Sequence, residues 1–378
     1  MNEKECQLLL LPNEKRISYY KHNINDLVDI DFVYFDCEKS NARMPKFSQN
    51  YSEIEVLPLA NYDNMFILNK YTYNKLVQIK ATTELSLDSN VIIGSLKDNQ
   101  RTEQYDAFFR DVENNDVMIN CFPYILESAC KDELSKKARI ETYRKIKGFF
   151  IRTNIQEEDA IIKTDNAYSV FLKMCSEELL QETSKRQIAV SYLYFIKTFI
   201  LKFKHVDEEA KIKELIDFIN DEIFIYLELT TAICIDYLKN DNKSIYVDFF
   251  KKFQLSAKDI FKDIKGMSWD ITLIYNIFRE GMERAVRYNA VALPYFVTRD
   301  KGLASVIKNN KIKSVSIKDG KISNMYFENG LNTMDLKDEH KYSLSVNSDL
   351  RKRRFNELNI DELVKKYEEE IKMLLSNR

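Results

Sequence analysis

The chain has 378 residues, 45% of them hydrophobic, and a formal net charge of −2 at pH 7. This length suits a large domain with an insertion, or two to three domains, and this apolar fraction excludes wholesale disorder. The nearly balanced charge excludes a surface that is basic throughout, so a nucleic-acid site would have to be a local patch.

Several residue types narrow the chemistry because they are scarce or scattered. The six cysteines form no C-x-x-C pair, and with no secretion signal they are expected to be reduced thiols of a cytoplasmic protein. The three histidines lie far apart and the seven glycines form no nucleotide-binding loop, which disfavours a histidine-based triad, a zinc site and a P-loop. The most apolar stretch, IAVSYLYFIKTFILKF, contains Lys197 and is shorter than the roughly 20 residues that cross a bilayer. We therefore expect a buried helix and no membrane partner.

The first part of the chain predicts a β-rich region followed by the start of an α/β core. Residues 1–80 contain short apolar runs such as DFVYFD and MFILNKYTY, which are typical of short strands joined by turns. Within residues 81–133, LSLDSNVII predicts a buried strand with Asp88 at its end. A polar helix around 99–115 and a second helix that contains Glu127 are expected next.

The middle of the chain, residues 134–262, has helical periodicity almost throughout and predicts a helical insertion. Over residues 263–330 the α/β pattern returns. WDITLIYNIFREGMERAVRYN predicts an amphipathic helix with Asp270 in its opening turn, ALPYFVTRD a buried strand that ends at Asp300, and KGLASVIKNN a helix. A hairpin is expected to turn at Asp319-Gly320. Residues 331–378 predict a tail with a charged helix. The fold class is therefore α/β, a core of strands and helices interrupted by a large all-helical insertion and preceded by the small β-rich region.

Four carboxylates occupy strand ends or nearby helices in this scheme. Asp88 and Asp300 end strands, and Glu127 and Asp270 lie on helices. In an open parallel sheet, the carboxyl ends of the strands and the adjoining helix starts converge on one crevice. Four carboxylates brought together repel one another, and Mg²⁺ or Mn²⁺, which prefer oxygen ligands, relieve that repulsion. One or two such ions can activate water and stabilise the leaving oxygen in phosphodiester cleavage.

The order of these motifs resembles that of the PIN and PIN-like ribonucleases. LSLDSNVI, PYILES, WDITLI and FVTRDKGL are similar to the family's four successive acidic motifs. The resemblance implies that the metal-binding and catalytic acids are Asp88, Glu127, Asp270 and Asp300, with Asn90 and Thr298 as neighbours that orient them. The chain departs from the common pattern because 143 residues separate Glu127 from Asp270, so the helical block has to be an insertion that leaves the core intact.

The resemblance implies a small parallel sheet between flanking helices and a metal-dependent endoribonuclease that uses Mg²⁺ or Mn²⁺ and acts on single-stranded or structured RNA. Because a free-standing nuclease in the cytoplasm would need restraint, a toxin or antiviral defence role is the expectation. Two alternatives remain open at this point. The chain could be a catalytically inactive PIN-like scaffold whose helical block recruits partners, or a metal-dependent nuclease of DNA. A regulatory protein partner and a homo-oligomer are both compatible with the sequence.

Two basic stretches are candidates for nucleic-acid binding. The first follows the Glu127 helix, and the residues expected to grip phosphates are Lys136, Lys137, Arg139, Arg144 and Lys145. Three aromatic residues of the same stretch could stack on bases: Tyr143, Phe149 and Phe150. The alternative is a solvated helix face with these aromatic residues in the core. The second stretch, RKRR at 351–354, could equally be a solubility or partner patch.

Each acid also has a purely structural interpretation. Asp88 could cap the loop after its strand and Asp300 the helix after its strand, Asp270 could favour a helix start through the dipole, and Glu127 could be a solvated helix residue. Three further acids compete for the site. They are Asp36, as a rival first acid, and Glu228 and Asp236, which could reach the site or lie on the solvated face of their helix.

Overall fold

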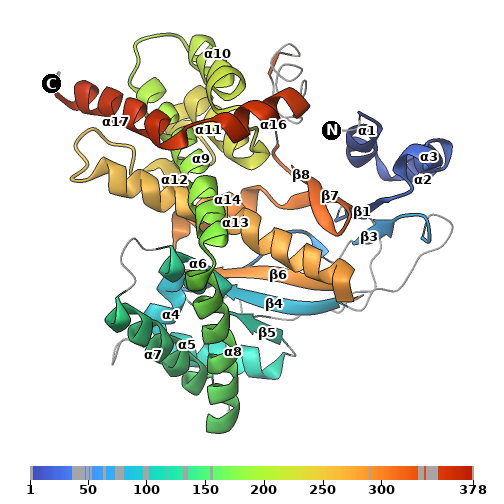
Figure 1. Cartoon of the computed structure of the whole chain (residues 1–378), viewed down its shortest axis with the longest axis vertical. Coiled ribbons are helices and arrows are strands. Elements are labelled where there is room, and N and C mark those ends of the chain that lie inside the picture. Colours follow the sequence, from blue (N-terminus) through green and yellow to red (C-terminus); the bar gives the residue numbers. More distant parts are fainter. Residues whose placement is uncertain are drawn as a thin grey trace.

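The computed structural model describes residues 3–35, 47, 51, 53–62, 65–72, 81–96, 102–115, 117–130, 135–153, 156–288, 291–330, 336–337 and 348–376. Over these residues the protein is mixed α/β, with helices predominating and two sheets of four strands each (Figure 1). Among the helices of this described part, none combines the length and the apolarity that crossing a bilayer requires.

One sheet carries the strand ends that the sequence singles out. Its order is β2-β6-β4-β5, and its strands are β2 Glu55–Pro58, β4 Ala81–Leu87, β5 Val117–Asn120 and β6 Val291–Thr298. Strand β4 runs parallel to both β5 and β6, whereas β2 is antiparallel to β6. Residues 292–298 are all buried, and such a nearly continuous apolar run is typical of a parallel sheet that is covered on both faces.

The second sheet has the order β3-β1-β7-β8. Its strands are β1 Ile30–Tyr34, β3 Phe66–Leu68, β7 Ile312–Lys318 and β8 Lys321–Phe327. The hairpin between β7 and β8 turns at Asp319 and Gly320, with φ of 52° and 70°, so the predicted turn is confirmed and has the left-handed backbone of a two-residue hairpin loop. The two sheets are joined where Ile312 N donates a hydrogen bond to Leu59 O at 2.8 Å.

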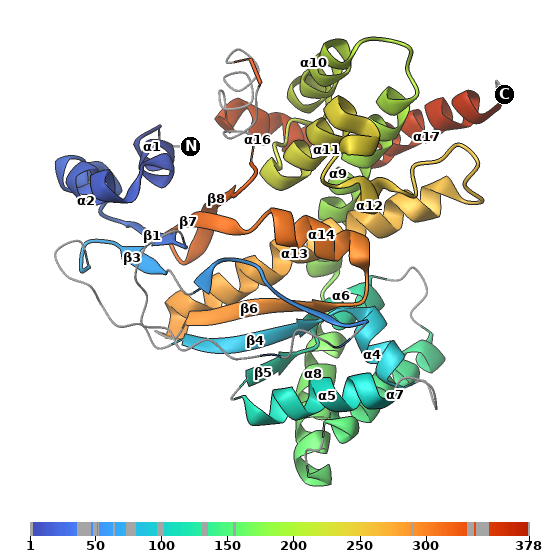
Figure 2. The ribbon, with the colours of Figure 1, turned by 180° about the vertical axis from the view of Figure 1, so that it is seen from behind.

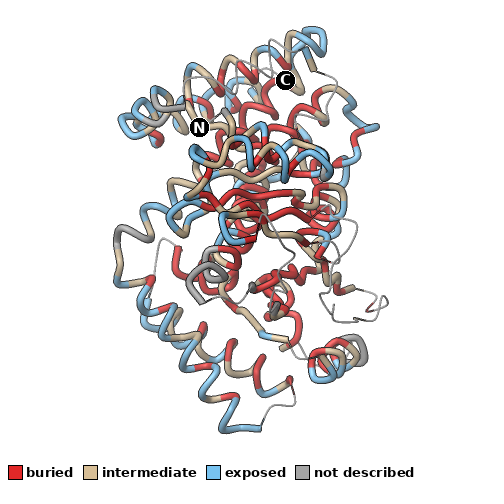
Figure 3. Tube along the Cα trace, turned by 90° about the vertical axis from the view of Figure 1, so that its right-hand side faces the viewer, coloured by how far each residue is buried: buried red, intermediate tan, exposed pale blue. Residues whose placement is uncertain are grey.

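Helices follow the strands of the first sheet and pack around it. Those closest to the strand ends are α4 Ser89–Ser95, α5 Thr102–Asn114, α6 Phe122–Ala129 and α14 Lys301–Asn309. The long helix α13, Ile260–Tyr288, packs against β6. Figure 2 shows it running along the sheet, and Figure 3 shows that buried chain is concentrated through the middle of the molecule, where sheet and helices meet.

Every regular element that the structure describes between residues 136 and 250 is helical. These elements are α7 Lys136–Arg152, α8 Glu157–Ser176, α9 Glu178–Lys202, α10 Glu208–Phe218, the π-helical turn η2 Ile219–Ile223, α11 Glu228–Asn240, the 3₁₀ turn η3 Asp241–Lys243 and α12 Val247–Phe250. They divide into two groups on opposite sides of the sheet (Figures 1 and 2). Helices α7 and α8 pack against α4 and α6, whereas α9 packs against α11, α13 and the C-terminal helix α17, Ile360–Ser376.

Several sequence expectations need correction. Residues 3–27 are not strands but three helices, α1 Glu3–Leu10, α2 Asn13–His22 and α3 Ile24–Leu27. The run LSLDSNVII is not one strand, because β4 ends at Leu87 and α4 begins at Ser89. The boundary expected at residue 262 falls inside α13, so Asp270 lies in the third turn of a continuous helix and cannot act on its N-terminus. The rival acid at position 36 lies outside the described residues.

Close packing at Pro294 fixes α13 against the sheet. A proline in a central strand normally removes a ladder hydrogen bond. Here the Pro294 carbonyl accepts hydrogen bonds from Leu59 N at 3.4 Å and Tyr62 Oη at 2.5 Å, so its nitrogen also faces that side, beyond the end of β2, and the ladder with β4 is kept. On the sheet face, a Cβ at Gly281 would lie 3.3 Å from Pro294 Cγ. A larger side chain at this contact would therefore have to displace the Pro294 ring or the helix.

We expect Gly281→Val to lower the free energy of unfolding by about 1–3 kcal/mol, because its branches would press on the Pro294 ring and force the helix outward. The matched control is Gly266→Val in the same helix, where nothing lies within 4 Å of an added Cβ, and we expect a change within about 0.5 kcal/mol. Urea unfolding followed by circular dichroism measures both variants. Equal losses in the two would contradict the close approach at Pro294.

Candidate functional site

Asp88 and Asp300 follow two adjacent parallel strands and therefore emerge at the same edge of the sheet. In the register of β4 and β6, Leu87 pairs with Val297, and Asp88 N continues the ladder by donating to Val297 O at 2.9 Å. Asp88 is 6% exposed, whereas Asp300 is half-buried. Parallel strands thus bring together two acids that are more than 200 residues apart in the sequence.

The hydroxyl of Thr298 connects these two acids. It donates to Asp88 Oδ2 at 2.7 Å and accepts from Asp300 N at 3.0 Å. Asn90 Nδ2 donates to the same Asp88 oxygen at 2.6 Å, and Asn90 Oδ1 accepts from Arg299 N at 3.1 Å. Because both ends of the Asn90 amide are held, the Asp88 carboxylate is fixed in one orientation by partners on α4 and β6.

Asp300 also has the structural role that the sequence left open. Its Oδ1 accepts a hydrogen bond from Leu303 N at 2.9 Å and caps α14, as aspartate often does at a helix start. The cap uses one carboxylate oxygen of Asp300, and the residue still lies beside Thr298. The cap and a role in an acidic site are therefore compatible.

Glu127 is positioned by a chain of hydrogen bonds that starts within β4. Glu84, 1% exposed, accepts from Asn120 Nδ2 at 2.6 Å, and Asn120 Oδ1 accepts from Phe122 N at 2.8 Å. The second bond fixes the first turn of α6, where Pro123 also favours helix initiation. Half-buried Glu127 projects from this helix, which packs against β4 and α13. The buried acid Glu84 was not among the expected site residues.

Asp270 is the acid whose ionisation is affected by the other three. Burial raises the pKa of its carboxyl well above the ordinary value, and the negative charges of Asp88, Asp300 and Glu127 raise it further, while Lys252 opposes them. The pKa of Asp88 is raised to about 6, mainly by burial and also by Glu127, against the lowering effect of its hydrogen bond from Thr298. The neighbouring acids therefore lie close enough to Asp270 and Asp88 to disfavour the ionisation of these two carboxyls.

Lys252 comes from the predicted insertion, and no pattern in the sequence singles it out. The segment that carries it is fixed to α14 by hydrogen bonds from Ser305 Oγ to Ile245 O at 3.3 Å and from Asn310 Nδ2 to Tyr246 Oη at 2.6 Å. A Cβ at Gly302, two residues after Asp300, would lie 3.0 Å from backbone atoms of this segment. Only a glycine lets the segment approach the α14 N-terminus so closely, which brings half-buried Lys252 within electrostatic reach of Asp270.

The donor chemistry of this acidic site fits a divalent cation. Carboxylate oxygens are the ligands that Mg²⁺ and Mn²⁺ prefer, and a bound cation would offset the repulsion at Asp270. The four carboxylates do not lie close enough to one another to share a metal ion, however. Within the described ranges, no three His, Cys, Asp or Glu side chains are arranged so that they could hold a metal ion. Metal binding by the four acids therefore stays a prediction, and it requires their side chains to close in.

The two competing acids of α11 occupy other environments. Glu228 is 8% exposed rather than on a solvated face, and burial raises its pKa to about 8, with a hydrogen bond to the Phe327 backbone opposing that rise. Asp236 accepts hydrogen bonds from Asn240 Nδ2 at 2.8 Å and Ser244 Oγ at 2.5 Å. Neither is among the charges that shift the pKa of Asp88 or Asp270.

The basic helix α7 lies next to this site and packs against α4. Lys136, Lys137 and Arg144 are exposed, and Arg139 and Lys145 are half-buried. Phe149 and Phe150 are buried in the core, at 0% and 3% exposed, as in the alternative given above, so neither ring is placed to stack on a base.

Tyr143 and the second basic stretch are also engaged with the protein. Tyr143 donates to Asp165 Oδ1 at 3.0 Å and packs against the Tyr168 ring. In the helix α16, Ser348–Glu357, Arg351 donates to Asn220 and the Arg354 guanidinium lies 5.5 Å from the Phe224 ring centroid. Part of RKRR therefore attaches the tail to the helical region.

Comparisons of the chain with protein-family models, with curated proteins and with solved structures find no match. The resemblance to PIN-like ribonucleases therefore rests on the four sequence motifs alone. The structure adds where the four acids lie.

We expect Asp270→Asn to raise the free energy of unfolding of the metal-free protein by at least about 1 kcal/mol at pH 7.5, because the amide removes a charge whose ionisation its neighbours disfavour. Urea unfolding in EDTA measures this gain. Asp263→Asn is the matched control, since Asp263 lies in the first turn of the same helix and its loss should slightly destabilise. A loss of stability in both variants would contradict the repulsion inferred at Asp270.

Proposed function

We propose that this chain is a PIN-like, metal-dependent nuclease that hydrolyses RNA phosphodiester bonds. The observation that carries the proposal is that three acids raise the pKa of Asp270, two of them, Asp88 and Asp300, at the carboxyl ends of adjacent parallel strands and the third, Glu127, on α6. An open α/β sheet typically places its ligand site at this edge. A coupled acidic cluster in such a place is a functional-site candidate on physical grounds, because stability alone disfavours it.

The four acids would hold Mg²⁺ or Mn²⁺, which when bound would supply an activated water and neutralise charge on the leaving oxygen. The other groups have roles that follow from their contacts. Thr298 and Asn90 hold the Asp88 carboxylate in place. Asp88, with a pKa raised to about 6, is mostly ionised at neutral pH and takes up a proton below about pH 6, so affinity for a cation should weaken there.

Cations of the chain would bind the phosphodiester on either side of the acids. The positive charge of Lys252 lowers the pKa of Asp270, so the two groups interact. The Lys252 ammonium could contact a phosphate that enters between them. The exposed cations of α7 would hold more distant phosphates through salt-dependent contacts that carry no sequence information. Lys252 would thus act at the scissile phosphate, whereas α7 would provide affinity for the nucleic-acid backbone that does not depend on sequence.

The decisive variant is Asp88→Asn, which keeps the side-chain size and removes one charge. We expect cleavage of labelled single-stranded RNA to fall by at least about 100-fold, because the acids act together on the cation. EDTA should abolish cleavage by the parent protein, Mg²⁺ or Mn²⁺ should restore it, and Ca²⁺ should support it poorly. Asp106→Asn, an exposed acid of α5, is the matched control and should cleave normally.

The same assay separates the alternatives. Cleavage of labelled DNA in preference to RNA would favour a DNA nuclease. RNA binding without cleavage under every metal would favour a catalytically inactive scaffold. Equal cleavage by parent and Asp88→Asn, with both folded by circular dichroism, would rule out this site.

We expect Lys252→Gln to lower cleavage about 10- to 100-fold while leaving the fold intact, because it removes the cation that faces Asp270. Lys251→Gln changes the neighbouring, exposed residue and should retain activity within about twofold. If the Lys251 variant loses as much activity as the Lys252 variant, general affinity for the phosphate backbone is responsible, and Lys252 has no specific role at the scissile group.

A further inference from the structure

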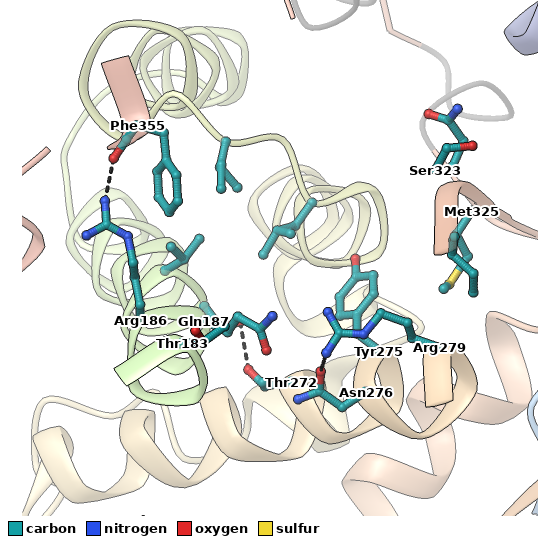
Figure 4. A pocket seen from close by; sticks show the side chains of 16 residues that line it. Thr183, Arg186, Gln187, Thr272, Tyr275, Asn276, Arg279, Ser323, Met325 and Phe355 are labelled. Atoms are coloured by element: carbon teal, nitrogen blue, oxygen red, sulfur yellow. Dashed lines mark hydrogen bonds between the residues drawn. The ribbon is translucent and has the colours of Figure 1, made fainter. Parts of the chain in front are cut away.

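A pocket separate from the acidic site lies where the insertion meets the core and the tail. It has a volume of about 390 Å³, within the range of about 300–1,000 Å³ that is usual for small-molecule sites. Its walls come from α9, α13, β8 and α16 (Figure 4). None of the four candidate acids lines it.

The apolar part of the pocket is formed by aromatic and aliphatic side chains. Phe355 comes from α16, Val190 from α9, and Ile322 and Met325 from β8. Arg186 closes one end, where it donates hydrogen bonds to the Phe355 and Leu358 carbonyls and lies over the Phe355 ring at 4.4 Å from its centroid. This arginine fixes α16 against α9 and so holds that wall in place.

The polar part points into the pocket from the other side. Asn276 is 5% exposed, and its Oδ1 accepts from Arg279 Nη2 at 2.8 Å. No hydrogen bond from its Nδ2 to a described residue accompanies that contact. Gln187 faces Arg279 across the space between α9 and α13 in Figure 4. Within the described chain, neither Arg279 nor Arg186 forms an ion pair with an acidic side chain, so the pocket holds positive charge that is not neutralised there.

We propose that this pocket binds a small organic anion with a flat apolar body. Arg279 would form a charge-assisted hydrogen bond to the acidic group, and Nδ2 of Asn276 and the Gln187 amide would donate to it or to a neighbouring acceptor. Phe355, Val190 and Met325 would contact the apolar body. An amide donor held at its other end by Arg279, beside the exposed guanidinium of that arginine and an apolar wall, is the kind of arrangement that small-molecule sites use for orientation and specificity.

The test uses two dyes of nearly the same shape and different charge. 8-Anilinonaphthalene-1-sulfonate carries a sulfonate, and N-phenyl-1-naphthylamine is its uncharged counterpart. Fluorescence titration of the folded full-length chain should give saturable sulfonate-dye binding with one site. Arg279→Gln should weaken the affinity for the sulfonate dye about tenfold and leave the affinity for the neutral dye unchanged, because only the first dye uses the charge.

A second variant tests the location without removing charge. Gln187→Trp should fill the pocket and abolish binding of both dyes. Arg110→Gln, an exposed arginine on α5, is the matched control and should bind like the parent. Circular dichroism verifies folding, since a partly unfolded chain also binds the sulfonate dye. Parent-like sulfonate-dye binding in both Arg279→Gln and Gln187→Trp, or no saturable binding by the parent, would overturn the proposal.

With the dye in place, displacement identifies the acidic group. Adenosine 5′-monophosphate carries a phosphate monoester and indole-3-carboxylate a carboxylate, each on a flat body. Displacement by the first alone assigns a phosphate, and displacement by the second alone assigns a carboxylate. In either case the displacement must be lost when Arg279 is replaced by glutamine, and its persistence would contradict the site.

Discussion

Repulsion between the buried carboxyl of Asp270 and the acids around it is the constraint around which the candidate site is built. Asp88 and Asp300, two of those acids, follow adjacent parallel strands and have to be held in place near Asp270. The structure does so with uncharged partners, since Thr298 contacts both residues and Asn90 holds the carboxylate of the first. Such an arrangement costs folding free energy, which is reasonable only where the charges have another use.

Helix α13 links the parts of the molecule that the chain order separates. It begins in the segment that the sequence assigns to the insertion, places Asp270 at the acids and contributes Asn276 and Arg279 to the pocket before it packs on β6 at Gly281. Residues at 276 and 279 are three apart and share a face, whereas Asp270 points elsewhere. A single rigid element therefore contacts both candidate sites through different faces.

Sequence reasoning located the elements whose patterns are local and strong. The β6 strand, α14 and the hairpin at Asp319-Gly320 follow from uninterrupted apolar runs, helical periodicity and turn chemistry, and all are present. The failures share a cause. In residues 3–27 short helices and short strands have similar apolar runs, and only packing decides between them. The sequence pattern begins helix α13 at Trp269, but the structure begins it at Ile260. The residues in between carry no signal that separates one helix from the next.

The four candidate acids are predictable from local sequence patterns, because they lie at the ends of strands or on the helices next to them. Sequence alone could not find Lys252, because that residue reaches Asp270 only through the contact between Gly302 and the segment that precedes the lysine. Glu84 was missed for a similar reason, since its partner Asn120 belongs to β5, a short strand without a distinct apolar signal. Long-range packing of this kind has no signature in a single sequence.

The buried carboxyl of Glu228 makes the folding of this protein a proton-linked reaction. In the folded chain the group keeps its proton up to about pH 8, whereas its ordinary pKa is 4.5. Between these two values the unfolded chain releases a proton that the folded chain retains, so unfolding becomes easier as the pH rises, by up to ~1.4 kcal/mol for each pH unit. The stabilisation from this group is complete below about pH 4.5 and is lost by about pH 8, so the Glu228 carboxyl by itself favours the folded state more in mild acid than in alkaline conditions.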